Sequence, residues 1–338
     1  MRVAALLLIV LALAAAGCGD SGGEDAAAGS EVAVVATTTI AADLVRNVGG
    51  DRVHVDSLLA AGADPHGYEP RPSDAVALSE AALVVSSGGD LDEWLDDLIE
   101  SAGGEATEVT LLDSVETIEG GHAQEEEADE GEGREEDETS GDEAREEDEA
   151  HADEDLDPHW WQDPRNAILA VEAIRDALIE VDPDGRRTYE RNTRAYTSKL
   201  RALDDEIERC MQRVPPEKRK LVTTHDALGY FAERYDVEVI GSVIPSLSTQ
   251  AQPSAGDVDA LVEQIEDEGV EAIFPEAAVS QRLERAISRE SGAEVGAELW
   301  TDSLGGDESG AETYLDAMRA NAGALAEGMS GGHVSCDG

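Results

Sequence analysis

Residues 184–214, which read DGRRTYERNTRAYTSKLRALDDEIERCMQRV, decide how the chain is organised. Apolar or small side chains recur in this stretch at steps of four and three residues, the pattern of an amphipathic helix with one continuous apolar stripe. The members of this stripe are Tyr189, Thr193, Tyr196, Leu200, Leu203, Ile207, Cys210 and Val214. A helix of this length extends over roughly 46 Å. Because a small domain needs no helix that long, the pattern predicts a stiff connection between two lobes.

On both sides of this helix, short apolar runs alternate with amphipathic stretches. Strands are predicted at residues 32–36, 53–58, 82–86 and 108–112 before the helix and at 221–224, 237–243, 272–274 and 294–299 after it. Helices are predicted at residues 40–48, 91–101, 164–182, 254–268, 281–290 and 312–327. Such alternation is typical of parallel sheets covered by helices. We therefore predict an α/β fold of two (β/α) lobes whose ligand binds in the cleft between them.

The N-terminus has the features of an export signal. A basic start and about 14 apolar residues precede Cys18, and this run is too short to cross a bilayer comfortably. Residues 15–18, AAGC, resemble a bacterial lipobox, in which cleavage leaves a lipidated cysteine. We therefore predict a signal peptide over 1–18, a lipid anchor at Cys18 and a flexible tether over 19–30. These features place the protein outside the cytoplasm and on the cell membrane; the alternative is a plain signal peptide with an incidental cysteine.

Residues 119–157 consist mainly of aspartate and glutamate and contain no aromatic residue. Such a stretch cannot form an apolar core, so it is predicted to be a disordered insertion within an N-terminal lobe of residues 31–182. His122 and His151 lie near its two ends, and the stretch acts either as a solvated loop or as a weak collector of cations. The linker helix, the C-terminal lobe and a tail are assigned to residues 183–214, 215–330 and 331–338.

Composition narrows the classes of partner. The 338 residues include 77 acidic and 24 basic side chains, for a net charge of −53, so a nucleic-acid partner is excluded by repulsion of its phosphates. Only three cysteines occur, too few for a disulfide scaffold or a cysteine zinc cluster. Outside the cytoplasm, Cys210 and Cys336 are candidates for one disulfide, with a buried thiol at Cys210 as the alternative.

Three of the seven histidines lie next to the ends of predicted strands or helices. His66 and His159 each close an Asp-Pro-His triplet, one on either side of the acidic stretch, and His225 follows a strand directly. Proline before a histidine restricts the local backbone, as a preorganised ligand requires. Asp302 follows the last predicted strand and is a fourth candidate, with a turn aspartate as the alternative. Asp64 and Asp226 are candidates for accepting hydrogen bonds from the ligand imidazoles, with turn formation as the alternative. Glu276 is a weaker candidate.

These segments resemble the metal-binding proteins of zinc and manganese ABC importers. The segments that carry the resemblance are ADPHGYEP at 63–70, RPSD at 71–74, DPHWW at 157–161, THDALGYF at 224–231, SLSTQAQPSA at 246–255 and TDSLG at 301–305. The resemblance implies two (β/α) lobes bridged by one long helix, with His66, His159, His225 and Asp302 as metal ligands. It also implies a membrane permease as partner, with a zinc metallochaperone as a further candidate, and we expect a monomer.

The donor set favours zinc as the transported ion. Three imidazoles and one carboxylate suit four-coordinate Zn²⁺, whereas manganese prefers more oxygen ligands. In the family that the chain resembles, members with an acidic, histidine-containing insertion are typically zinc proteins. The alternatives are a manganese importer component, a surface zinc buffer or adhesin, and a zinc hydrolase. A hydrolase needs an open coordination position and a general base, and a carboxylate at Asp302 would close that position, so an enzyme is not expected.

Overall fold

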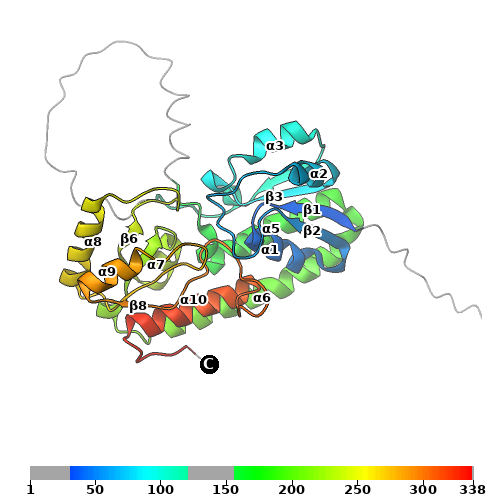
Figure 1. Cartoon of the computed structure of the whole chain (residues 1–338). Coiled ribbons are helices and arrows are strands. Elements are labelled where there is room, and N and C mark those ends of the chain that lie inside the picture. The colour runs from blue at the N-terminus through cyan, green and yellow to red at the C-terminus, as the bar shows by residue number, and fades with distance from the viewer. Residues whose placement is uncertain (1–30, 121–155, 337–338) are drawn as a thin grey trace, which may run out of the picture. The chain divides into compact units, whose positions relative to one another are not determined.

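The computed structural model describes residues 31–120 and 156–336 (Figure 1). The predicted signal peptide and tether, Cys18, His122 and His151 lie outside the described residues, and so does most of the acidic stretch. The predictions made for them therefore stay predictions, as do the lobe boundaries.

A four-stranded parallel sheet forms the first half of the described chain. Its strands are β1 (Val32–Ala36), β2 (Val53–Ser57), β3 (Leu83–Ser86) and β4 (Thr107–Thr110), in the order β2-β1-β3-β4. Its helices are α1 (Thr39–Gly49), α2 (Pro72–Glu80), α3 (Leu95–Ala102) and α5 (Pro164–Val181). Helix α2 was not predicted, because its apolar residues form no clear stripe; it begins at Pro72, and Asp74 accepts the Arg71 backbone N–H at 2.6 Å.

The second half repeats the arrangement with shorter strands. Strands β5 (Lys220–His225) and β6 (Glu238–Ile244) pair in parallel, as do β7 (Ala272–Ile273) and β8 (Glu294–Val295). A parallel bridge between Thr223 and Phe274 sets β7 beside β5. The helices are α7 (Gly229–Tyr235), α8 (Ala255–Glu268), α9 (Glu284–Ser291) and α10 (Tyr314–Met329). The prediction of one strand over 294–299 was wrong, since pairing stops at Val295 and only Leu299 forms a further bridge, to Glu276.

Helix α6 (Arg186–Met211) is the predicted long helix, and it begins two residues later and ends three residues earlier than expected. A 3-10 turn over Pro183–Gly185 occupies its expected start. The whole predicted stripe is buried. The helix packs against α1 and α5 of the first half and against α7 and α10 of the second, and α10 runs beside it in Figure 1.

One buried apolar cluster includes side chains from both halves, from Val34 on β1 through Leu200 on α6 to Leu325 on α10. Smaller clusters lie under α8 and α9 in the second half and under α2 and α3 in the first. The predicted α/β class with parallel sheets and one connecting helix is confirmed. Because the main core continues through both halves, α6 packs its apolar face against that shared core and leaves its polar face exposed.

Candidate metal centre

The four predicted ligands come from four segments that the fold brings to one place. His66 lies in the loop that follows β2, and His159 precedes a 3-10 turn, Trp160–Gln162, that leads into α5. His225 is the last residue of β5, and Asp302 follows the Leu299 bridge. Strand β5 is parallel to its neighbours, so His225 lies at the carboxyl edge of the second sheet, where ligands of such folds bind.

The ligand atoms of this quartet, His66, His159, His225 and Asp302, all lie within 4.8 Å of one another. His225 Nε2 is 3.3 Å from His159 Nε2 and 3.4 Å from Asp302 Oδ2. His66 Nε2 is 3.6 Å from Asp302 Oδ2, and His159 Nε2 is 3.7 Å from Asp302 Oδ1. Within the described residues, no other group of histidine, cysteine, aspartate or glutamate side chains gathers in this way.

The quartet is shielded from solvent and leaves polar atoms without partners. Its four side chains are between 0% and 3% exposed. His66 Nε2 and Asp302 Oδ1 are buried and form no hydrogen bond. A buried polar atom without a partner is costly, so the arrangement fits side chains that share a cation.

His159 is oriented by an aspartate that sequence reasoning missed. Asp157 Oδ1 accepts the backbone N–H of His159 at 2.9 Å and lies 2.7 Å from its ring Nδ1. Burial lowers the pKa of His159, but the charges of Asp157 and Asp302 outweigh burial and raise it above its ordinary value. Asp157 occupies the same place in its Asp-Pro-His triplet as Asp64, and this repetition in the sequence is the signal that indicates its role beside His159. The sequence-based prediction places Asp157 only at the end of the acidic stretch.

Glu276 plays the corresponding part for His225. Its two carboxylate oxygens lie 2.8 Å from His225 Nδ1, and Oε1 also accepts the His225 backbone N–H at 2.9 Å. Thr301, the residue before Asp302, donates its hydroxyl to Glu276 Oε2 at 2.9 Å. This bond holds the Glu276 carboxylate in place. Burial lowers the pKa of His225, but Glu276 and Asp302 together raise it to about 10.

Asp302 is the carboxylate at the centre of the quartet. Burial raises its pKa, but the neighbouring imidazoles of His225, His66 and His159 hold that pKa well below the usual range. The metal-free centre therefore holds an ionised carboxylate among imidazoles, two of which have raised pKa values. Such a centre binds a cation by exchanging protons for it.

The other two predicted carboxylates make different contacts. Asp64 Oδ1 accepts the backbone N–H of His66 at 3.0 Å, and its Oδ2 accepts the Thr249 hydroxyl at 2.6 Å. The buried Asp226 donates its own backbone N–H to the carbonyl of Ser246 at 3.1 Å. The His66 ring contacts Asp302 through Nε2, whereas the rings of His159 and His225 each contact a second carboxylate through Nδ1. Asp64 thus holds His66 through its backbone, and Asp157 and Glu276 hold their histidines through both the backbone and the ring.

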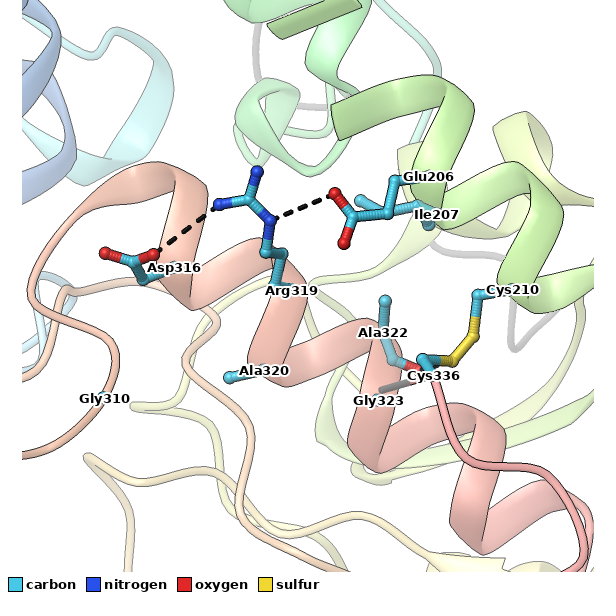
Figure 2. Close-up of a pocket in the computed structure, with 10 residues that line it drawn as sticks. All are labelled: Glu206, Ile207, Cys210, Gly310, Asp316, Arg319, Ala320, Ala322, Gly323 and Cys336. Atoms are coloured by element: carbon cyan, nitrogen blue, oxygen red, sulfur yellow. Dashed lines mark hydrogen bonds and ion pairs between the residues drawn. A yellow bond between two sulfur atoms is a disulfide. The ribbon is translucent and has the colours of Figure 1, made fainter. Parts of the chain in front are cut away.

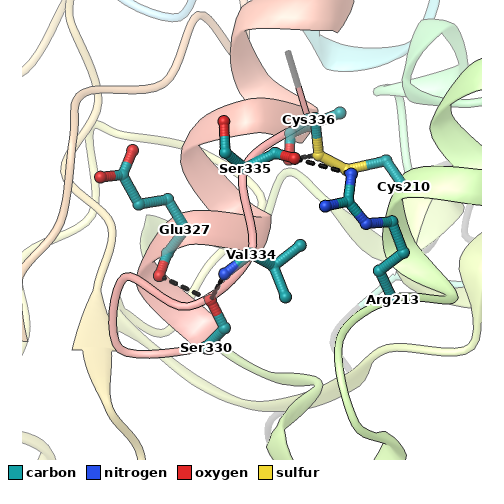
Figure 3. The surroundings of a disulfide bond; sticks show 8 residues. Cys210, Arg213, Glu327, Ser330, Val334, Ser335 and Cys336 are labelled. Atoms are coloured by element: carbon teal, nitrogen blue, oxygen red, sulfur yellow. Dashed lines mark hydrogen bonds between the residues drawn. A yellow bond between two sulfur atoms is a disulfide. The ribbon is translucent and has the colours of Figure 1, made fainter. Parts of the chain in front are cut away.

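The structure joins the remaining two cysteines. Cys210 on α6 and Cys336 after α10 form a disulfide with their Cα atoms 5.5 Å apart, and Arg213 donates to the Ser335 carbonyl beside it at 2.7 Å (Figure 3). A cavity of about 350 Å³ next to this bond lies between α6 and α10, where Arg319 pairs with Glu206 and Asp316 (Figure 2). None of the quartet lines that cavity.

Comparison with known proteins places the chain among metal transport components. The family model described as "Zinc-uptake complex component A periplasmic" matches residues 34–328. The manganese-binding lipoprotein MntA of Halalkalibacterium halodurans is 31% identical over 292 residues, which cover 86% of each chain. The iron-binding protein YfeA of Yersinia pestis is 28% identical over 295 residues, 87% of this chain and 85% of that one.

A solved structure agrees in fold. The periplasmic zinc binding protein TroA of Treponema pallidum superposes with a TM-score of 0.73 at 26% identity, covering 89% of this chain and all of that one. The family match covers most of the chain, and this chain carries the cluster of three histidines and one aspartate described above. The chain therefore belongs to the zinc-uptake complex component A family, the extracytoplasmic metal-binding components of ABC transporters.

Proposed function

We propose that the protein captures Zn²⁺ at the quartet of His66, His159, His225 and Asp302 and presents it to a membrane permease. The observation that carries the proposal is the convergence of three imidazole nitrogens and a carboxylate within 4.8 Å of one another. Capture requires deprotonated ligands held in place and no bond-breaking step.

The spacing of the ligand atoms supports zinc. Four ligands placed tetrahedrally at the usual zinc bond lengths of about 2.0–2.2 Å are separated from one another by about 3.3–3.6 Å. Four of the separations in the quartet run from 3.3 Å between His225 and His159 to 3.7 Å between His159 and Asp302, and none of the ligand atoms is more than 4.8 Å from another. These four separations are close to those of a tetrahedral zinc site. The carboxylates on His159 and His225 orient the rings, as carboxylates commonly do for zinc-bound histidines.

Manganese is the second candidate, because Asp302 offers both of its oxygens. Oδ2 lies near His66 and His225, and Oδ1 lies near His159, so a five-coordinate ion with a bidentate carboxylate also fits. Relatives are named for manganese, zinc and iron, so family membership leaves the ion open. Three nitrogen ligands favour zinc over the oxygen-rich sites that suit manganese.

Neither a zinc hydrolase nor a surface zinc buffer without a transporter is favoured by this arrangement. Asp302 occupies the position that a hydrolase would leave open for water, and Glu276 is hydrogen-bonded to His225 and Thr301 rather than free to act as a general base. The named relatives are binding proteins of transporters. Zinc uptake that fails without this chain would distinguish a transport component from a buffer.

Elemental analysis and metal competition test the proposal. Purified protein should contain one tightly bound zinc, and Zn²⁺ should displace Mn²⁺ when both are supplied at equal concentration. His225→Ala should abolish tight binding, while His54→Ala should leave it unchanged, because the His54 side chain on β2 is 65% exposed, contacts Asp56 and is not among the clustered ligands. Tight zinc binding by the His225 variant would contradict the proposal.

We also propose that Cys18 is lipidated and tethers the protein to the membrane. Several relatives are named lipoproteins. In the described part of the chain, none of the helices is both long and apolar enough to cross a bilayer. Cys18→Ser should release the protein from membranes into the soluble fraction, and unchanged retention would refute the anchor.

A further inference from the structure

The loop that carries His66 is held by a loop of the opposite half. Residues 246–250, which follow β6, place the Thr249 hydroxyl 2.6 Å from Asp64 Oδ2. The other oxygen of the same carboxylate accepts the His66 backbone N–H at 3.0 Å. One aspartate therefore connects a residue of the second half directly to the backbone of a predicted ligand in the first half.

Loop 246–250 is itself anchored near a second ligand. The Ser246 carbonyl accepts the backbone N–H of Asp226, which directly follows His225 in the chain. Leu247 packs against Gly120, and a side chain at position 120 would require the Leu247 side chain to shift. The Ser248 backbone N–H donates to the Ser246 hydroxyl at 3.1 Å, which stiffens the loop. The loop thus spans from the His225 end of β5 to the His66 loop.

Two other bonds between the halves near the quartet end on backbone carbonyls. Gly62 donates to the Leu304 carbonyl at 2.8 Å, and Trp161 Nε1 donates to the Thr301 carbonyl at 2.7 Å. Thr249 and Asp64 are partly exposed, and their bond joins two side chains. The Thr249–Asp64 bond therefore lies at an accessible side of the centre. It acts on His66, whose ring contacts Asp302, whereas the rings of His159 and His225 also contact a second carboxylate.

We propose that Thr249 is a positioning residue for the metal centre: its hydroxyl, through Asp64, holds the His66 loop closed over the bound ion and slows release of that ion. This inference rests on the proposed function, because it assumes that His66 binds the metal. Opening of the Thr249–Asp64 bond loosens the His66 end of the loop, whose Gly62 end stays bonded to Leu304, while Asp157 and Glu276 keep the other two imidazoles in place. Release of the ion then begins at His66.

The test compares Thr249→Val with Thr249→Ser in the full chain. Zinc transfer from the loaded protein to a chromophoric chelator is followed by stopped flow. Thr249→Val removes the hydroxyl and should speed zinc release about tenfold, as expected for loss of a hydrogen bond to a charged group beside a ligand. Thr249→Ser keeps the hydroxyl and should release zinc within about twofold of the native rate. The melting temperature of the metal-free variants shows whether each is folded, and Thr249→Ala replaces the valine variant if that one is destabilised.

A second comparison separates positioning from a general structural effect. In a His66→Ala background, Thr249→Val should no longer alter the release rate, because the residue acts through His66. Equal release rates for the valine and serine variants in the native background would overturn the role of Thr249, and so would an undiminished effect in the His66→Ala background. Unchanged zinc affinity in His66→Ala alone would instead overturn the proposed metal site, and the role of Thr249 with it.

Discussion

The two Asp-Pro-His triplets, residues 64–66 and 157–159, have the same sequence and the same local turn but hold their histidines differently. In each, the aspartate Oδ1 accepts the backbone N–H of the histidine, at 3.0 Å in the first and 2.9 Å in the second. In the second, that oxygen also lies 2.7 Å from the ring Nδ1. In the first, the other carboxylate oxygen, Asp64 Oδ2, accepts the Thr249 hydroxyl.

The difference between the triplets comes from their surroundings. Asp157 and His159 are fully buried, so the carboxylate and the ring satisfy each other. Asp64 and His66 lie at the accessible side of the centre, where a neighbouring loop competes for the carboxylate. The same three residues thus produce one ligand whose ring contacts the triplet aspartate and one ligand that this aspartate holds only through the backbone.

Removal of the two histidines should have the largest effects and should differ between them. His159→Ala is expected to lower zinc affinity about a thousandfold, because it removes a ligand and leaves Asp157 buried without its partner. His66→Ala is expected to cost about a hundredfold, since Asp302 keeps its contacts with the imidazoles of His159 and His225. Isothermal titration with a competing chelator measures both. Equal losses would show that the two ligands are held alike.

Replacement of the two aspartates tests the comparison more directly. Asp157→Asn should lower zinc affinity roughly 10–100-fold, the usual cost of losing the carboxylate partner of a ligand imidazole. Asp64→Asn should lower it only about threefold, because the amide oxygen can still accept the His66 backbone N–H. The same chelator competition gives both affinities. A larger loss in the Asp64 variant would reverse our assignment of the two roles.

The carboxylate-paired imidazoles predict how affinity depends on pH. The pKa of His225 is raised to about 10, so its ring holds a proton at neutral pH that zinc must displace, and the raised pKa of His159 acts in the same direction. Affinity should therefore rise with pH, by about tenfold per pH unit for each displaced proton between pH 6 and 8.

Glu276→Gln should make this pH dependence shallower. Loss of the Glu276 charge lowers the pKa of His225, so fewer protons are displaced when zinc binds. Titration calorimetry in buffers of different ionisation enthalpy counts the released protons. An affinity that does not change with pH in the native protein would contradict the raised pKa values.

The disulfide should have the smallest effect on metal binding, because it contacts neither triplet. It closes a sequence separation of 126 residues, so Cys336→Ser is expected to lower the free energy of unfolding by about 2–4 kcal/mol. Zinc affinity should stay within about twofold, because Cys210 and Cys336 lie beside the cavity between α6 and α10. Denaturant unfolding and chelator competition measure the two quantities. A large loss of affinity would show that the two helices control the quartet.

Local patterns in the sequence were sufficient to predict the α/β class and the long helix and to single out four candidate ligands, whereas their grouping into one site followed from the resemblance to metal-binding proteins of ABC importers. The stripe of α6 has the period of a helix, and the ends of parallel strands share one edge of a sheet, so both follow from the order of residues. Helix α2 was missed because its cap, in which Asp74 accepts the Arg71 N–H, is not accompanied by an apolar stripe. The early end of β8 was missed because the apolar Leu299 lies beyond it, although Leu299 forms only a single bridge.

The assignment of each carboxylate to its ring required the folded chain. Asp157 and Asp64 stand in identical triplets, and nothing within either triplet tells which one contacts an imidazole. Glu276 reaches His225 across 51 residues, and Thr249 reaches Asp64 across 185. Contacts at such separations depend on how the two halves pack around α6, and a short-range pattern carries no information about that packing.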